Sequence, residues 1–252
     1  MKKTLIEASE KAGEILLENF HKVKSVRVKG RGDIVTNVDL QTEKTVKQII
    51  QDAFPDHGFL GEEFGESKGN SEFVWIVDPL DGTTNYSRGI PLFNTSIAVA
   101  RKGEVFMGAV NCPVTQELFF AEKGNGATLN GKKIKVSEVD KVEDSFLSFC
   151  DGHTLESKKA ALDYFMKLKL EAIDVRKLGS AALELSLLAC GRLDGFFSLG
   201  TKAWDVAAGT LIIQEAGGKV TDFEGKQFSL DKSSGVVASN KRIHAELLKI
   251  LK

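Results

Sequence analysis

Residues 73–85 read FVWIVDPLDGTTN, and this stretch decides the expected fold. It begins with an uninterrupted apolar run, FVWIV, which predicts a strand covered on both faces. Pro79 lacks a backbone N–H and is expected to end the strand ladder, while Gly82 lets a ligand approach the backbone closely. Asp78 and Asp81 would therefore lie at the end of a buried strand, where ligand sites of open α/β sheets form.

The turn after this strand carries two kinds of ligand-binding group. Its two aspartates can converge on a hard cation, and the amides of Gly82, Thr83 and Thr84, if they begin a helix, point at an anion. Cation ligands beside a phosphate cradle indicate metal-assisted phosphoryl chemistry. The simpler alternative is a strand-to-helix turn in which both aspartates only cap the helix.

The flanking segments show regular patterns. Apolar residues recur at helical spacing over 4–20 and 40–54, which predicts two amphipathic helices. The segment 21–29 alternates valine with basic residues and is predicted as an irregular strand or an exposed hairpin arm. Strand-like runs and turns over 93–136 predict an antiparallel meander, and from residue 145 strands and helices alternate in a layered α/β pattern. The predicted strands are 145–150, 172–176, 193–199, 219–222 and 235–239, and the predicted helices are 155–169, 180–190, 204–216 and 241–251.

Length and composition limit the class of protein. The chain has 252 residues, 42% of them hydrophobic, which suits one large globular domain or two lobes that share an interface. The polar connector at 138–144 predicts an N-terminal α+β lobe over 1–140 and a C-terminal α/β lobe over 141–252. Lysine plus arginine number 34 against 35 aspartate plus glutamate, which argues against a dedicated nucleic-acid binder.

Targeting signals are not expected. Glu7 and Glu10 interrupt the start before an apolar core of a signal peptide can form, and no run reaches the ~18 apolar residues of a membrane span. Cys112, Cys150 and Cys190 are far apart and flanked by apolar residues. We expect buried, reduced thiols and a cytoplasmic protein.

Further acidic residues have ordinary explanations when each is taken alone. Glu62 and Glu63 are adjacent, a pattern typical of a solvated turn. Asp205 near the start of a predicted helix would favourably offset the helix dipole. Asp39 could be the N-cap of the second helix.

Taken together, however, these segments resemble the inositol monophosphatase family. This family contains lithium-sensitive, magnesium-dependent phosphatases, including fructose-1,6-bisphosphatases of archaeal type and nucleotide 3′-phosphatases. The matching segments are DIVTNVD at 33–39, GEE at 61–63, WIVDPLDGTTN at 75–85 and WDVAAG at 204–209, with weaker matches at 124–137, 176–185 and 215–222. The resemblance implies an αβαβα sandwich and a Mg²⁺-dependent phosphomonoesterase.

Carried over to matching positions, the resemblance implies two to three Mg²⁺ ions. The first would be held by Glu62, Asp78 and the backbone carbonyl of Leu80. The second would be held by Asp78, Asp81 and Asp205. Glu62 and Glu63 would lie near a weaker third ion.

The resemblance also implies the catalytic residues. Asp39 and Thr83 would orient the attacking water, and the amides of Gly82 and Thr83 would hold the phosphate oxygens. Asp205 and the second metal would stabilise the leaving alkoxide. Positioning and electrostatics would then supply most of the rate.

On the alcohol side the family pattern points to Gly179, Ser180 and Ala181, with Asp81 accepting from a substrate hydroxyl. Inositol-selective members typically have a glutamate in a phrase such as FFEIG, where this chain reads FFSLG with Ser198. A serine can still bond a sugar hydroxyl, but it cannot grip two neighbouring hydroxyls as a carboxylate does. Small polyol or sugar phosphates, with broad specificity, are therefore the expected substrates.

Alternatives remain open beside this expectation. The first enzyme alternative is a fructose-1,6-bisphosphatase, either alone or as a second activity beside the inositol phosphatase. The next is a 3′-phosphonucleotide phosphatase. The non-enzymatic alternative is an RNA or transcription accessory protein. The family pattern further implies a homodimer. The lack of a long apolar run predicts no membrane partner, and the charge balance argues against a nucleic-acid partner. The basic run Lys22, Lys24, Arg27, Lys29 and Arg31 suggests a solvated strand face or a flap over an anionic substrate, with Lys29 best placed to reach it.

Overall fold

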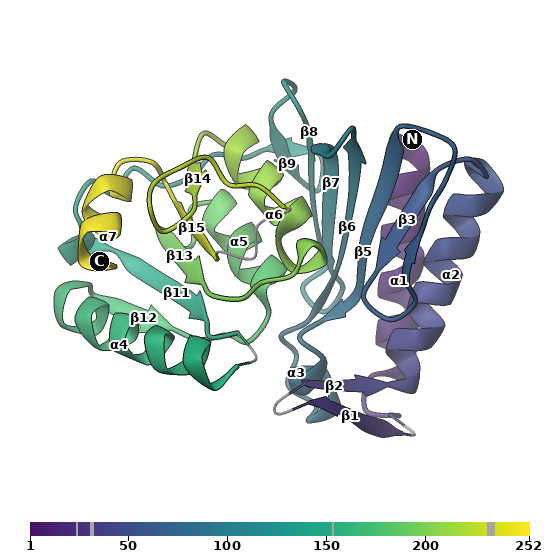
Figure 1. Ribbon diagram of the computed structural model, residues 1–252, viewed down its shortest axis with the longest axis horizontal. Coiled ribbons are helices and arrows are strands. Elements are labelled where there is room, and N and C mark those ends of the chain that lie inside the picture. Colours follow the sequence, from purple (N-terminus) through teal and green to yellow (C-terminus); the bar gives the residue numbers. More distant parts are fainter. Residues whose placement is uncertain (24, 31–32, 153, 231–234) are drawn as a thin grey trace.

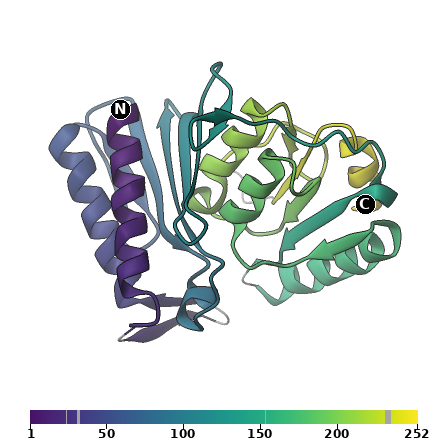
Figure 2. The same ribbon diagram turned by 180° about the vertical axis from the view of Figure 1, so that it is seen from behind.

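The helices and strands form layers in the order αβαβα (Figures 1 and 2). The structure is a computed structural model that describes residues 1–23, 25–30, 33–152, 154–230 and 235–252. Lys24, Arg31 and His153, and the side chain of Lys29, lie outside this description. The predicted αβαβα sandwich is confirmed.

The first two layers are a helix pair and a large sheet. Helices α1 (Lys2–Asn19) and α2 (Asn37–Ala53) cover one face of an eight-stranded sheet with the order β10-β9-β8-β7-β6-β5-β3-β4. Trp75 and Val77 of β5 pack toward these helices, while Ile76 packs into the core on the other face. The predicted doubly covered strand is thus confirmed. The strands are β3 (Gly58–Gly61), β4 (Gly65–Ser67), β5 (Phe73–Asp81), β6 (Asn94–Arg101), β7 (Glu104–Cys112), β8 (Glu117–Glu122), β9 (Ala127–Leu129) and β10 (Lys132–Lys133).

The remaining layers are two inner helices, a second sheet and two outer helices. Helices α5 (Ala181–Ala189) and α6 (Ala203–Glu215) lie between the sheets, and α4 (Leu155–Glu171) and α7 (His244–Ile250) cover the outer face of the second sheet (Figure 1). This five-stranded sheet has the order β12-β11-β13-β15-β14. Its strands are β11 (Phe146–Cys150), β12 (Asp174–Arg176), β13 (Gly195–Ser198), β14 (Lys219–Thr221) and β15 (Val236–Ser239).

One hydrophobic core joins the inner helices to both sheets. Ile76 and Val110 of the large sheet belong to the same buried cluster as Leu185 and Phe196. Helix α6 lies close to the large sheet at Gly108 of β7. A Cβ atom at this position would lie only 2.9 Å from the Cα of Ala208. The cluster combines residues from both predicted lobes, and the boundary at residue 140 stays a prediction.

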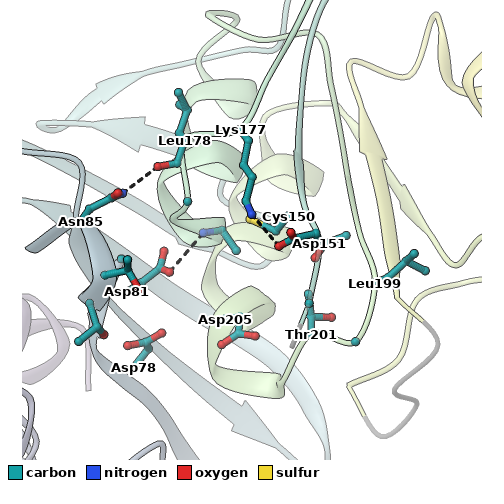
Figure 3. A pocket seen from close by; sticks show the side chains of 18 of the residues that line it. Asp78, Asp81, Asn85, Cys150, Asp151, Lys177, Leu178, Leu199, Thr201 and Asp205 are labelled. Atoms are coloured by element: carbon teal, nitrogen blue, oxygen red, sulfur yellow. Dashed lines mark hydrogen bonds and ion pairs between the residues drawn. The ribbon is translucent and has the colours of Figure 1, made fainter. Parts of the chain in front are cut away.

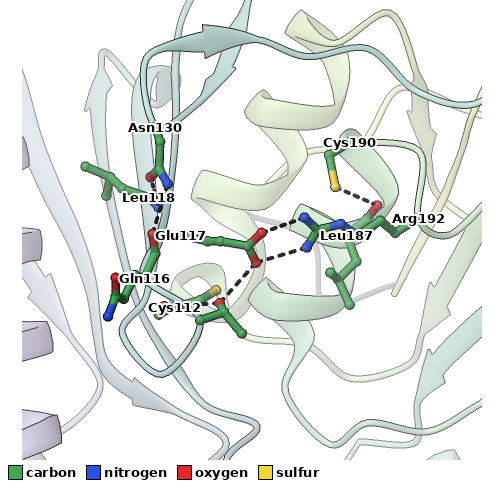
Figure 4. Close-up of polar contacts among 9 residues, drawn as sticks. Cys112, Gln116, Glu117, Leu118, Asn130, Leu187, Cys190 and Arg192 are labelled. Atoms are coloured by element: carbon green, nitrogen blue, oxygen red, sulfur yellow. Dashed lines mark hydrogen bonds and ion pairs between the residues drawn. The ribbon is translucent and has the colours of Figure 1, made fainter.

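An ion pair connects the large sheet with the segment between α5 and β13 (Figure 4). The two Nη atoms of Arg192 donate to the two carboxylate oxygens of Glu117 at 2.9 and 2.5 Å. Thr115 Oγ1 donates to the same carboxylate at 3.0 Å. The Arg192 guanidinium lowers the pKa of Glu117, so the carboxylate stays charged and the bidentate ion pair is maintained.

The amino-terminal arm and the meander follow the predicted pattern. β1 (Val26–Gly30) and β2 (Asp33–Thr36) form an antiparallel ribbon, which confirms the hairpin arm. Asn130 and Gly131 have φ angles of 48° and 76° between β9 and β10, as expected for a two-residue hairpin turn. The meander was predicted to reach residue 136, but its last strand ends at Lys133. Residues 134–136 form no strand, and Val136 N donates to Ala216 O.

One local prediction around the site, for Pro79, and one alternative explanation, for Asp39, are also wrong. Pro79 interrupts the ladder between β5 and β6, but pairing resumes where Asp81 faces Asn94. The N-cap of α2 is Thr36, and Asp39 lies in the first turn, where its carboxylate accepts from Thr36 N in a capping box. Asp39 therefore reaches back to the helix start instead of beginning the helix.

Two further expectations concern buried, reduced cysteines and the lack of a membrane-spanning helix. All three cysteines are free; Cys112 is buried as predicted, whereas Cys150 and Cys190 are half-buried. Among the described residues, no helix combines the length and apolar character that a membrane crossing requires.

Candidate active site

A cavity of ≈ 470 Å³ lies where the end of β5 faces α5, α6 and the segment after β11. Short helix α3 (Thr83–Ser87) begins at its wall. The carboxyl groups of Asp78, Asp81 and Asp205 lie around one end of the cavity, and the ion pair of Lys177 with Asp151 lies on the other side (Figure 3). The predicted site residues that line it are Glu62, Asp78, Leu80, Asp81, Gly82, Thr83, Gly179, Ala181, Ser198 and Asp205.

Asp78 is the most enclosed acid of the cavity. It lies near the end of β5, has 2% of its surface exposed, and accepts a 3.0 Å hydrogen bond from Leu80 N. Burial raises the pKa of Asp78 well above its usual range, and the negative charges of Glu62, Asp81 and Asp205 raise it further. The four carboxyl groups therefore lie close enough for each charge to oppose ionisation of its neighbours.

Asp81 is held by an array of donors. Its Oδ2 accepts from Asn94 Nδ2 at 2.9 Å, from Ser180 Oγ at 2.7 Å and from Ala182 N at 2.8 Å. Ala181 N donates to Oδ1 at 3.2 Å. Burial raises the pKa of Asp81, and these hydrogen bonds oppose the rise. Asp81 therefore fastens the end of β5 to the start of α5.

Asp205 approaches the same space from α6. Its Oδ2 accepts from Lys202 N at 2.7 Å, so the carboxylate offsets the helix dipole as the sequence suggested. Burial raises the pKa of Asp205 to about 8, with further contributions from the charges of Asp81 and Glu62. Helix capping and membership of the acidic group are thus compatible.

Thr83 and Asp39 form a hydrogen-bonded pair at the cavity wall. Thr83 Oγ1 lies 3.1 Å from Asp39 Oδ1 and 2.9 Å from the carbonyl oxygen of Leu80, two acceptors for its one proton. Asp39 is fully buried behind Thr83 and also accepts from the hydroxyl of Thr36. Burial is the main cause that raises the pKa of Asp39 to about 6, and the charge of Glu63 adds to it.

Glu62 and Glu63 lie in the turn after β3. Glu62 lines the cavity, whereas Glu63 does not. Glu43 of α2 fixes this turn, because its carboxylate accepts from the backbone N–H groups of Glu63 and Phe64, both at 2.8 Å. Glu43 was not predicted; it follows Asp39 by one helical turn, and that spacing was the available signal.

The wall of the cavity that was predicted to face the substrate's alcohol is formed by the loop before α5 and the end of β13. Gly179 has a φ of 79° and lines the cavity, whereas Ser180 lies beneath it and bonds Asp81. Ser198 Oγ is buried and has no hydrogen-bond partner in the described part of the chain. Asn85, to which no role was assigned, donates from Nδ2 to the carbonyls of Leu178 at 2.7 Å and Leu92 at 2.8 Å.

The acidic group has the chemistry of a Mg²⁺ site. Within the described ranges, no three His, Cys, Asp or Glu side chains stand as a ready-made metal site. Mg²⁺ does not require one, since it keeps several waters and takes one or two carboxylates from the protein. Buried oxygens that raise one another's pKa are stabilised by a cation, so Asp78, Asp81, Asp205 and Glu62 fit this ion.

Metal removal should make stability depend on pH in a defined direction. Asp205, with its pKa raised to about 8, and Asp39, with its pKa raised to about 6, bind protons more tightly in the folded state. Their contribution is present below the unfolded pKa of ~4 and is lost as pH rises through the folded values. In EDTA, the midpoint of thermal unfolding should therefore fall between pH 5 and pH 8.5.

Added Mg²⁺ should reverse this loss. At ~100 times its Kd, a bound ion adds ~2.7 kcal/mol, which corresponds to ~5–10 °C for a chain of this size. Differential scanning fluorimetry with EDTA or Mg²⁺ across that pH range measures both effects. An unfolding midpoint that is equal in EDTA and Mg²⁺ at pH 8 would contradict the assignment.

The fold and the site together define a class: a layered α/β protein with buried carboxylates and a helix start around one polar cavity. The model of the inositol monophosphatase family matches residues 1–252, and the chain belongs to this family.

Relatives carry two kinds of name. The chain is 41% identical to "Inositol-1-monophosphatase" of Mesorhizobium japonicum over 254 residues, which cover 98% of this chain and 94% of that protein. It is 41% identical to "Nus factor SuhB" of Xylella fastidiosa over 224 residues, covering 88% and 81%. The crystal structure of extragenic suppressor protein suhB from Bartonella henselae matches with a TM-score of 0.96 at 37% identity, covering 100% of this chain and 98% of that one.

Proposed function

We propose that the protein is a Mg²⁺-dependent phosphomonoesterase that hydrolyses small polyol or sugar phosphates, similar to an inositol-1-monophosphatase but with broad specificity. The observation that carries this proposal is a group of four acids that line one cavity: Glu62, Asp78, Asp81 and Asp205. The charges of the other three raise the pKa of Asp78. The family membership agrees with phosphatase chemistry.

The metal ligands follow from this proposal. Glu62, Asp78 and the Leu80 carbonyl would hold one Mg²⁺, and Asp78, Asp81 and Asp205 would hold a second. Glu62 and Glu63 lie near a weaker third. When bound, the ions polarise the phosphoryl group and lower the pKa of water.

Thr83 and Asp39 position the attacking water. The Thr83 hydroxyl donates its hydrogen bond to Asp39 Oδ1 or to the Leu80 carbonyl. Its oxygen lone pairs can therefore accept a hydrogen bond from a water in the cavity. A proton released by that water can pass through Thr83 Oγ1 to Asp39. A carboxylate with a pKa of about 6 accepts it more readily than an ordinary aspartate.

The remaining residues bind the two ends of the substrate. The N–H groups of Gly82 and Thr83 lie at the start of α3, where helical N–H groups lack partners within the helix, and they hold the phosphate oxygens. Gly179, Ala181 and Ser198 line the alcohol side. Ser180 acts there through its hydrogen bond to Asp81.

A substrate panel tests the proposed activity and the alcohol specificity. Phosphate release is measured with Mg²⁺ from inositol 1-phosphate, sugar monophosphates, fructose 1,6-bisphosphate and a 3′-phosphonucleotide. Release from several polyol or sugar monophosphates supports broad specificity. Preference for the bisphosphate or the nucleotide would support the respective alternative enzyme.

Ser198→Glu should shift this preference toward inositol 1-phosphate. The buried Ser198 side chain has a single hydroxyl oxygen, whereas a carboxylate there has two oxygens that can accept from two neighbouring hydroxyls. We expect kcat/KM for inositol 1-phosphate relative to glycerol 2-phosphate to rise about tenfold, the effect of ~1.4 kcal/mol. Ser198→Gln, a side chain of similar size without the charge, is the control. An unchanged ratio would remove Ser198 from the specificity residues.

A second candidate function is a transcription accessory role, because relatives such as that of Xylella fastidiosa are named Nus factor. The formal net charge of −1 gives no general attraction to RNA, so the phosphatase proposal is preferred. Background phosphate release across the whole panel, together with retained folding, would favour the accessory role.

Three broader expectations stay predictions. The homodimer rests on the family resemblance and is tested by light scattering on the purified protein. The cytoplasmic location is supported by the free thiols of Cys112, Cys150 and Cys190. The lobe boundary at residue 140 is tested by limited proteolysis at 138–144.

A further inference from the structure

Glu184 is a buried carboxyl group that the proposed mechanism does not use. It lies in the first turn of α5 and has no exposed surface. Its Oε1 accepts from the backbone N–H groups of Leu178 at 3.1 Å and Gly179 at 3.0 Å, and Cys150 Sγ lies 3.6 Å away. A buried carboxyl is costly to keep, so these contacts require an explanation.

The segment that Glu184 holds forms a wall of the cavity. Leu178 and Gly179 both line it. The carbonyl of Leu178 accepts from Asn85 Nδ2 at 2.7 Å, the contact drawn in Figure 3. Glu184 therefore takes the N–H groups of this segment while Asn85 takes its carbonyl, and the loop is fixed from both sides.

The contacts do not depend on a negative charge. Burial raises the pKa of Glu184 to about 8, which leaves the carboxyl largely protonated at neutral pH. The carbonyl-type oxygen of a neutral acid still accepts two N–H bonds. In the described part of the chain neither Oε2 nor the buried Ser148 hydroxyl makes a hydrogen bond of ordinary geometry, but Ser148 lies close enough to lower the pKa of Glu184. A glutamine amide nitrogen in the Oε2 position can donate to that hydroxyl.

We propose that Glu184 is a positioning residue, which fixes the Leu178–Gly179 backbone so that the alcohol side of the cavity is formed before substrate binds. The role in substrate binding rests on the proposed phosphatase function. The anchoring of the loop does not. Glu184 touches no reacting atom, and its effect reaches the substrate through the loop backbone.

Two measurements on the full-length protein test the two parts of this proposal. Hydrogen exchange of the Leu178 and Gly179 amides, followed by NMR, reports the anchor. The kinetic constants for inositol 1-phosphate report the binding wall. In Glu184→Ala two N–H groups lose their acceptor, and both the exchange rates and KM should rise about tenfold, the effect of ~1.4 kcal/mol, with kcat within threefold.

Glu184→Gln should restore both values to within about threefold of wild type, because the amide oxygen accepts the same N–H groups. Glu184→Leu fills the space without an acceptor and should resemble the alanine variant; it serves if Glu184→Ala does not fold. Ser186→Ala is the matched control, since among the described residues this buried hydroxyl on the same helix donates to Ala182 O alone. It should leave exchange and KM unchanged.

The outcomes separate the claims. Unchanged amide exchange in a folded alanine or leucine variant would overturn the anchor. Faster exchange with an unchanged KM would overturn its role in substrate binding. A fall in kcat with constant KM and constant exchange would indicate only a smaller folded fraction. That result would overturn both the anchor and its role in substrate binding. If the wild type releases no phosphate, the phosphatase proposal fails, while the exchange rates still decide the anchor.

Discussion

Asp78→Asn is expected to lower kcat/KM for Mg²⁺-dependent phosphate release by about 10³-fold, the effect of losing ~4 kcal/mol of transition-state stabilisation. Asp78 is proposed to bind both principal ions, and it is buried in the acidic group. Asparagine keeps the shape but removes the charge that holds the cations. Phosphate release from inositol 1-phosphate at several Mg²⁺ concentrations measures the loss.

The same variant should change stability in the opposite direction without metal. Burial and the charges of Asp81, Asp205 and Glu62 oppose ionisation of Asp78 in the folded state, whereas the unfolded chain ionises it freely. An amide avoids this penalty, so Asp78→Asn should unfold at a higher temperature than wild type in EDTA. The stabilisation by Mg²⁺ should largely disappear. Asp163→Asn on the exposed surface of α4 is the control and should change neither value. Activity of Asp78→Asn within a few-fold of wild type would contradict the metal assignment.

Thr83→Ala is expected to lower kcat by about 10²–10³-fold, within the range of proton-transfer catalysis. The substitution removes the hydroxyl between the cavity and Asp39 and leaves Asp39 Oδ1 without that donor. A water in the cavity then loses the hydroxyl that connects it to Asp39. Steady-state kinetics at saturating Mg²⁺ measure the effect, with KM expected to change less than kcat.

Thr83→Ser provides the matched control for this prediction. Serine retains the hydroxyl that lies 3.1 Å from Asp39 and 2.9 Å from the Leu80 carbonyl. Its kcat should stay within about tenfold of wild type, since only a methyl group and its restriction of the side-chain rotamer are lost. Equal losses in the serine and alanine variants would show that the hydroxyl does not take part in proton transfer.

The sequence predicted the central strand and its surroundings because their signals are local. The uninterrupted run FVWIV predicts burial on both faces, and β5 packs Trp75 and Ile76 into cores on opposite sides. The helical periods over 4–20 and 40–54 were equally reliable, since they depend on a few neighbouring residues. The layer order followed from the alternation of these elements and from the family resemblance.

The errors arose where tertiary contacts change a local rule. Pro79 does interrupt the ladder, but the strand continues because Asp81 again pairs with Asn94. Asp39 lies in the first turn of α2, and its carboxyl bonds both the helix start and Thr83. No pattern within one segment predicts a contact between residues 44 positions apart.

The residues that fix the site were the hardest to predict. Glu43 and Asn85 bond backbone groups of distant segments, so their roles appear only once those segments are neighbours in space. Glu184 bonds the loop five and six residues before it, but that this loop lines the cavity appears only in the structure. Ser180 was expected beside the alcohol but lies beneath the cavity on Asp81. The motifs identified the acidic residues, whereas the hydrogen bonds that orient them required the structure.

Phosphate release by the wild-type protein, first freed of metal with EDTA and then titrated with Mg²⁺, tests the central claim most directly. The substrate is inositol 1-phosphate, and the same titration with Asp163→Asn checks for effects of the preparation. We predict background release without metal and a saturable return of activity with Mg²⁺, because cations must neutralise the acidic group before a phosphate dianion can approach. Release at the same rate in EDTA, or background release at saturating Mg²⁺, would contradict it.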